Sequence, residues 1–253
     1  SRSGTIDLQT ESVSIRGGDG LLSYAQIGHG GGGARGTDFA GAVSVVANQG
    51  IEILGGVGGA AYAQIGHGGA MAHADMDGAV TVEAGASIAL RSADLATLGY
   101  AKIGHGDDLR GSFATYAGTG LRDGAVQISA GEDISLEGAQ IGHVGSTSPA
   151  LLAAGATTWL AVSKDAPSDP SGGSLLADAA TEFGGSEVRF YLPRRGNNGV
   201  AAGAWINGTA YDGGVGDPWP VQRADEYTHY IETAGGLLEP AEHNSSPGDG
   251  PVP

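Results

Sequence analysis

The tripeptide Ile-Gly-His occurs four times in this chain at a fixed spacing, each histidine following the previous one by 38 residues. The isoleucines are Ile27, Ile65, Ile103 and Ile141, and the histidines are His29, His67, His105 and His143. Self-similarity at such a period is typical of solenoids and blade arrays, in which one unit cannot bury its own apolar face and must stack on its neighbours. The sequence therefore predicts a stack of repeats.

Each repeat contains three short segments in which apolar residues alternate with other residues. A period of two is that of a half-buried strand with β-branched side chains on its inner face. The apolar pairs are Ile6 and Leu8, Val43 and Val45, Val80 and Val82, and Val126 and Ile128 in the first segment; Val13 and Ile15, Ile51 and Ile53, Ile88 and Leu90, and Ile134 and Leu136 in the second; and Ala25, Ala63, Ala101 and Ala139, each with the isoleucine of its tripeptide, in the third. Three strands per repeat predict a triangular coil.

The predicted fold is all-β, a parallel β-helix of about four 38-residue coils followed by a less regular C-terminal β extension. Corner lengths vary while the strands keep their alternation, since Leu136 and Ile141 are much closer in sequence than Ile53 and Ile65. Insertions confined to corners are how a solenoid accommodates loops. A β-propeller is the competing fold, but its blades need antiparallel strands and hairpin turns, whose signals these repeats lack.

Composition excludes several classes of function. Gly accounts for 48 of 253 residues and aromatics for only 6%, which favours thin strands with permissive corners over a helical bundle. The absence of Cys excludes disulfides, thiolate metal sites and thiol catalysis. A net charge of −16 with only 12 Lys and Arg argues against nucleic acid and anionic membranes as partners. No apolar run approaches the roughly 18 residues of a membrane span, and no signal-like segment opens the chain, so we expect a mature or excised piece.

The repeat units Gly-Ala-Val-Ser-Val-Val-Ala at 41–47, Gly-Ala-Val-Thr-Val-Glu-Ala-Gly at 78–85 and Tyr-Ala-Gln-Ile-Gly-His-Gly-Gly at 62–69 resemble the β-helical repeats of filamentous-haemagglutinin-type adhesins. The resemblance covers about residues 1–165. It implies a right-handed β-helix on the outer cell surface of a Gram-negative bacterium or outside the cell, often exported by two-partner secretion. The Asn-Pro-Asn-Gly element of the secretion domain is absent from this sequence.

The period ends after His143, and the sequence divides into three parts. Residues 1–149 are predicted to form the β-helical region and 150–238 an irregular β extension that closes one end. Strands are expected at 159–162 and 188–192, whereas 164–173 is rich in Pro, Asp and Gly, as turns are. Residues 239–253 contain four Pro and no apolar periodicity, which predicts a tail that is disordered or bound to a neighbour.

The four histidines are predicted to form a structural ladder, spaced about 4.8 Å apart along the axis. Imidazoles are common metal ligands, yet a ladder holds its side chains parallel, whereas a metal needs converging ligands. Each ring is expected to bond to a corner carbonyl instead. A metal or haem site and a pH-sensitive element are the alternatives.

Tyr and Gln recur beside the tripeptide with the parity opposite to Ala and Ile, which predicts that they face outward. The residues are Tyr24, Tyr62 and Tyr100, and Gln26, Gln64 and Gln140, with Lys102 interrupting the glutamines. Stacked amides and rings would stabilise neighbouring coils. The functional alternative is a stripe that contacts surface glycans.

Acidic residues are expected in the variable corner loops rather than in a catalytic cluster. They are Asp75, Asp77, Asp107, Asp108 and Asp123. We expect no cofactor and no enzymatic activity, with a loop calcium site as a weaker alternative. A polysaccharide-degrading or carbohydrate-binding β-helix is the competing function.

The predicted function is that of a secreted structural or adhesive β-solenoid. It would be a rod segment of a surface adhesin or a subunit of an extracellular filament. An uncapped first coil exposes an apolar cross-section and unpaired backbone groups, which are a template for further strands. We therefore expect head-to-tail self-association or continuation of a longer helix, with Ile6, Leu8, Trp205 and Ile206 as the candidate assembly surface.

Overall fold

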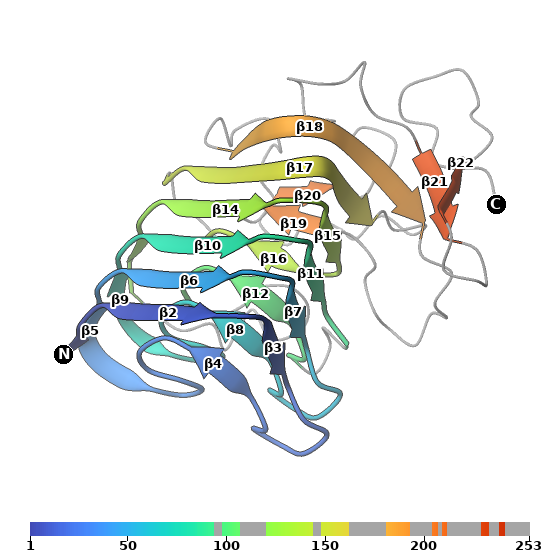
Figure 1. The fold of residues 1–253 in the computed structure, drawn as a ribbon. Coiled ribbons are helices and arrows are strands. Elements are labelled where there is room, and N and C mark those ends of the chain that lie inside the picture. Colours follow the sequence, from blue (N-terminus) through green and yellow to red (C-terminus); the bar gives the residue numbers. More distant parts are fainter. Residues whose placement is uncertain are drawn as a thin grey trace.

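The computed structural model describes residues 1–93, 98–106, 120–143, 148–161, 181–192, 204–206, 209–211, 229–232 and 238–240. The described residues form strands and connecting turns. Among them, no helix is long and apolar enough to cross a bilayer. The prediction of an all-β chain with parallel sheets is confirmed, and equivalent strands of successive repeats lie one above another (Figure 1).

Each repeat places two strands in the largest sheet. The first face consists of β2 (Ile6–Thr10), β6 (Val43–Ala47), β10 (Val80–Ala84) and β14 (Val126–Ala130). The second face consists of β3 (Val13–Arg16), β7 (Ile51–Leu54), β11 (Ile88–Arg91) and β15 (Ile134–Glu137). Neighbouring strands pair in parallel, and their apolar residues are in register, as where Val80 pairs with both Val43 and Val126.

One long strand joins these two faces at the far end of the stack. The first half of β17 (Ala150–Ala161) pairs with β14, and its second half pairs with β15. The result is a nearly closed path of nine parallel strands from β2 to β3. Strand β18 (Thr181–Leu192) pairs in parallel with β17 and lies at the top of Figure 1, followed by β21 (His229–Glu232) and β22 (Leu238–Pro240).

The third face contains the Ile-Gly-His segments. Its strands are β4 (Ala25–Ile27), β8 (Ala63–Ile65), β12 (Ala101–Ile103) and β16 (Gln140–Ile141). Beyond β16 the face continues with β19 (Ala204–Ile206), in parallel, and then β20 (Thr209–Tyr211), antiparallel. Parallel stacking therefore extends past the point where the sequence period ends.

A fourth strand in each repeat was not predicted. The outer sheet consists of β1 (Arg2–Ser3), β5 (Arg35–Ala40), β9 (His73–Asp77) and β13 (Arg122–Asp123). Asp75, Asp77 and Asp123 lie in these strands, so the prediction that they occupy corner loops is wrong. The reason is local alternation: Ala74 and Met76 are buried and pack with Phe39 in a cluster of their own.

The main core lies between the first three faces. It contains the predicted Val, Ile, Leu and Ala positions, with Ile65, Ile103 and Ile141 fully buried and Ile27 partly buried against them. Burial of one such side chain contributes roughly 1.5–3 kcal/mol. The two-residue alternation of the sequence thus identified this core correctly.

The glycine of the tripeptide is required by close backbone packing. At Gly66 the backbone has φ +141°, and an added Cβ would lie 2.2 Å from the carbonyl oxygen of Gly104, one repeat later. Side chains rarely adopt that φ, and no Cβ fits so near an oxygen. The tripeptide therefore needs glycine at this position, where the backbones of successive repeats approach each other closely.

Candidate functional site

The histidines form a continuous stack along the end of the third face. Successive ring centroids are 4.6–4.9 Å apart, and the ring planes are inclined by at most 18°. These separations match the predicted strand spacing. Each Nε2 lies 2.7–2.8 Å from a corner carbonyl oxygen, and the acceptors are Gly4, Gly41, Gly78 and Gly124. The predicted bond between ring and corner carbonyl is confirmed.

The second ring nitrogen links each repeat to the one before it. Nδ1 of His67 accepts the backbone N–H of His29 at 3.0 Å, and Nδ1 of His105 accepts that of His67 at 3.0 Å. Nδ1 of His143 does the same for His105 at 2.8 Å. Because Nδ1 accepts and Nε2 donates, these rings are neutral and protonated only at Nε2.

This tautomer decides what the stack can do chemically. A metal ion needs a free nitrogen lone pair, and at His67, His105 and His143 the lone pair of Nδ1 already accepts a backbone hydrogen bond. Within the described ranges, no group of three His, Cys, Asp or Glu could hold a metal ion. The stack is therefore suited to joining repeats.

Burial holds these rings in the neutral form. It lowers the pKa of His67 and, to well below 6.5, that of His105. Burial, with the nearby Lys102 ammonium, lowers the pKa of His143 to about 4. A proton on Nδ1 would also face a backbone N–H, so protonation would break the bond between repeats.

The glycines whose carbonyls receive the histidines were missed as site residues. Gly4, Gly41, Gly78 and Gly124 precede the first-face strands. A Cβ at Gly78 would lie 2.1 Å from the oxygen of Gly41, and one at Gly41 would lie 2.2 Å from that of Gly4. Each of these glycines stands two residues before the first apolar residue of a first-face strand, and this recurrence is the signal that could have identified them.

The prediction that the Tyr and Gln stripe faces outward to solvent is wrong. Tyr62, Tyr100, Gln64 and Gln140 are fully buried, as is Lys102. Their side chains leave the main core as the parity predicts, but the chain after His67 returns across Tyr62, so that Gly69 lies against the tyrosine hydroxyl. Tyr62 and Tyr100 pack with Ala60, Ala70 and Leu98 in a second cluster. This cover removes the interior part of the stripe as a glycan-contacting surface.

The buried stripe joins successive repeats. Tyr24, Tyr62 and Tyr100 stack with centroids 4.7 and 4.9 Å apart. The Tyr62 hydroxyl donates to Oε1 of Gln26 at 3.2 Å, and Nε2 of Gln26 donates to the carbonyl of Gly66 at 2.8 Å. Gln64 repeats this bond to Gly104 at 2.8 Å. Burial raises the pKa of the Tyr62 hydroxyl, which therefore stays a donor.

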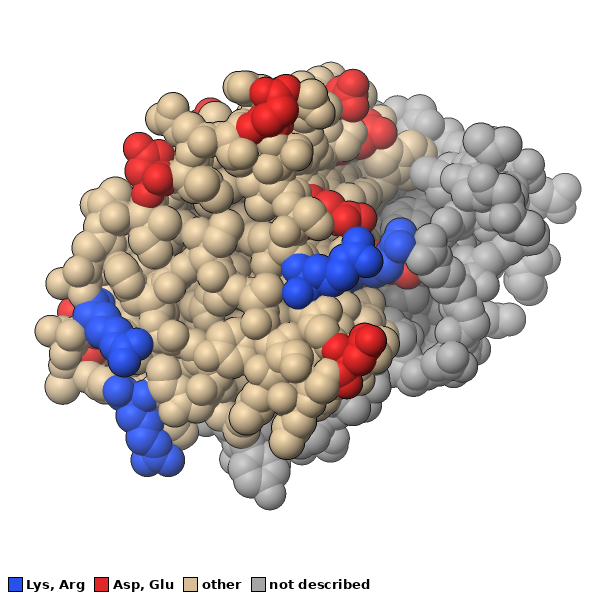
Figure 2. Space-filling model, turned by 60° about the horizontal axis from the view of Figure 1, so that its bottom comes forward, with Lys and Arg blue, Asp and Glu red and all other residues tan. Residues whose placement is uncertain are grey.

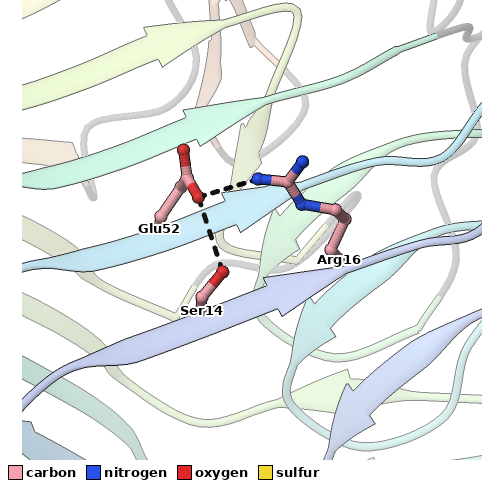
Figure 3. Close-up of polar contacts among 3 residues, drawn as sticks. All are labelled: Ser14, Arg16 and Glu52. Atoms are coloured by element: carbon pink, nitrogen blue, oxygen red, sulfur yellow. Dashed lines mark hydrogen bonds and ion pairs between the residues drawn. The ribbon is translucent and has the colours of Figure 1, made fainter.

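The second face connects repeats by charge on its outer side. Oε2 of Glu52 accepts from the Arg16 guanidinium at 3.2 Å and from the Ser14 hydroxyl at 3.4 Å (Figure 3). Both charged side chains are about half exposed, so the pair contributes at most about 1 kcal/mol. Arg91 and Glu137 form a shorter pair at 2.8 Å, in which the Glu137 side chain is buried. The Arg16 and Glu52 contacts are typical of a solvated sheet surface.

The predicted assembly residues occupy opposite ends of the stack. Ile6 and Leu8 are in β2, an edge strand, and pack against the main core while partly exposed. Trp205 and Ile206 are in β19, where they pair with Gln140 and Ile141. Strand β19 therefore covers the last Ile-Gly-His strand of its own chain.

A shallow hollow of about 400 Å³ opens beside the outer sheet. Its lining is mostly polar and includes Arg35, Thr37, His73 and Asp75. Oδ1 of Asp75 accepts the backbone N–H of Leu121 at 2.9 Å. Asp123 accepts from the Ser148 hydroxyl, which lowers its pKa. These carboxylates are thus bonded within the protein, while Asp107 and Asp108 lie outside the described residues.

Comparison with known proteins assigns no family. No family model, curated protein or solved structure matches this chain. The function must therefore be inferred from the stack itself.

Proposed function

We propose that this chain is a secreted, non-enzymatic structural or adhesive β-solenoid. Its fold would be a right-handed parallel β-helix, serving as a rod segment of a Gram-negative surface adhesin or as a subunit of an extracellular filament. The resemblance of its repeats to filamentous-haemagglutinin-type adhesins supports the cell-surface location. The acidic composition is compatible with it.

The position of the edge strands is the observation that supports the proposal best. The first repeat supplies β1, β2, β3 and β4, and each is the terminal strand of its row of parallel strands. All four rows therefore end together at one end of the stack. Terminal strands present unpaired backbone groups, which can receive further strands.

The surface chemistry of this end fits stacking. Figure 2 views the molecule toward the first repeat, the bottom of Figure 1, and shows a broad area without Lys, Arg, Asp or Glu between Lys and Arg side chains at its left and a row of them that extends inward from its right. The uncharged part of this end avoids the cost of desolvating charges during association.

Electron microscopy of the purified chain tests the proposal. At micromolar concentration we expect particles joined end to end into rods of constant width. Sedimentation velocity should show species larger than the single chain, which dissociate on dilution. Uniform single particles at every concentration would contradict the filament form of the proposal.

The competing function is carbohydrate binding or degradation, and the hollow lined by Arg35, Thr37, His73 and Asp75 is the observation that favours it. Incubation with acidic polysaccharides, followed by assay for new reducing or unsaturated ends, separates the two. We expect no turnover. Turnover abolished by Asp75→Asn, with the fold retained, would replace the structural proposal by an enzymatic one.

A further inference from the structure

We infer that the first rung of the third face, residues 24–29, is an unfilled binding site for a parallel β-strand of sequence Gln-apolar-Gly-X, where X is any residue except Pro. This inference rests on the rod-segment form of the proposed function, in which a further repeat covers the open end of the stack. Such a strand occurs in this chain at Gln26–His29 and Gln64–His67.

Three polar contacts recur between interior rungs. A tyrosine hydroxyl donates to the glutamine of the preceding repeat, as Tyr62 does to Gln26. That glutamine donates to the glycine carbonyl of the following repeat, as Gln26 does to Gly66. Finally, the backbone N–H of the preceding histidine donates to the following Nδ1, as between His29 and His67.

On the first rung, the groups that would make these contacts with a preceding repeat are the Tyr24 hydroxyl as donor, and the Gly28 carbonyl and Nδ1 of His29 as acceptors. In the described part of the chain, no group makes the corresponding bond to any of them. The Tyr62 ring has a tyrosine stacked on each side, whereas Tyr24 has only Tyr62. Its exposed fraction is 39%, against 0% for Tyr62.

An apolar patch continues this unfilled rung. Leu22 is 49% exposed, whereas Ala60 and Leu98, one and two repeats later, are 5% and 6% exposed. These three residues share a left-handed backbone, with φ between 54° and 62°. The first repeat therefore has the interior conformation without the interior cover. A docked repeat would supply that cover.

One tetrapeptide would make all the missing polar contacts. Its glutamine side chain would accept from the Tyr24 hydroxyl and donate to the Gly28 carbonyl. The backbone N–H of its fourth residue would donate to Nδ1 of His29. Its apolar residue would stack on Ile27, as Ile65 does within the chain. Glycine is needed at the third position because a Cβ at Gly28 would lie 1.9 Å from the Gly66 oxygen, and the docked strand repeats that approach.

A fusion that adds one repeat to the full chain tests this inference. Arg2, Phe39 and Met76 are paired positions of successive rungs, so a copy of residues 39–75 placed directly before Arg2 continues the register. We expect the amides of residues 25–29 to exchange at least about tenfold more slowly than in the unmodified chain, with a raised melting temperature.

The matched control is the same fusion with Gln64→Ala inside the copied segment. It should lose most of the added protection. His67→Ala in the copy should lose less, because it removes a ring that would stack on His29 but keeps the backbone N–H that would bond to Nδ1 of His29. Unchanged exchange of residues 25–29 in the fusion would overturn the inference.

A different outcome is that, in the unmodified chain, the amides of residues 25–29 are protected from exchange at high concentration and lose that protection on dilution. This result would mean that a second copy covers the rung, and it would also overturn the inference. The outcome is independent of filament formation, because the fusion tests only the chemistry of the rung. A chain that forms no rods can still bind the added repeat.

Discussion

The backbone N–H of His67 donates a 3.0 Å hydrogen bond to Nδ1 of His105, one repeat later, and the two rings stack with centroids 4.7 Å apart. One side chain thus bonds the neighbouring backbone through Nδ1 and a first-face corner through Nε2. Each ring of the ladder thus joins a neighbouring ring, a neighbouring backbone and a first-face corner. The protonation state of the ring affects all three contacts.

Acid should destabilise the folded chain. Because burial lowers the pKa of these histidines, the unfolded chain binds protons more readily, and the free energy of unfolding falls as pH falls below 6.5. For His143 the pKa falls from 6.5 to about 4, which corresponds to stability on the order of 3 kcal/mol that is present at neutral pH and lost across that interval. Urea unfolding at several pH values measures the slope.

A His143→Gln variant is the control for this pH effect. It removes one titrating group, so its stability should decline less steeply between pH 6.5 and 4. An equally steep decline in both proteins would show that other groups cause the acid sensitivity.

Gln64→Ala should destabilise the chain by about 2–4 kcal/mol, because it leaves the Gly104 and Gly106 carbonyls without their side-chain donor in a buried layer. Gln26→Ala is the matched variant in the half-exposed first repeat, and we expect it to cost about half as much. Denaturant unfolding of both variants provides the comparison. Equal losses would mean that the cover over Gln64 opens freely to water.

Gly66→Ala should cost at least about 3 kcal/mol, because both the φ of +141° and the 2.2 Å approach to Gly104 oppose a side chain. Gly50→Ala is the control, since its Cβ would meet only the Ser87 oxygen, at 3.2 Å, with no left-handed φ. Thermal unfolding should separate the two by many degrees. A stable Gly66→Ala variant would show that the glycine stack can spread apart.

The main core and the ladder could be predicted because both repeat in register with a strand period. Alternation identified Val45 and Ile65 as inward-facing residues, and the spacing of His67 from His105 identified the stack. Side-chain parity, however, shows only which side of its own sheet a residue faces. It could not show that the chain after His67 returns over Tyr62 and buries it, because that cover comes from glycine-rich segments without alternation.

The outer sheet was missed for a related physical reason. In β9 the buried residues are only Ala74 and Met76, between acidic and histidine residues that resemble a loop in composition. Their burial depends on Phe39 in the neighbouring strand, one repeat away. Such a cluster is recognisable only after the repeats have been placed side by side.

Nitrogen NMR of the histidine rings tests the central claim, that the repeats stack in register through this ladder, most directly. At pH 7 we predict that His67, His105 and His143 are protonated at Nε2 only, with a coupling across the hydrogen bond between the backbone nitrogen of His67 and Nδ1 of His105. Rings protonated at Nδ1, or exchanging rapidly between tautomers, would contradict the account.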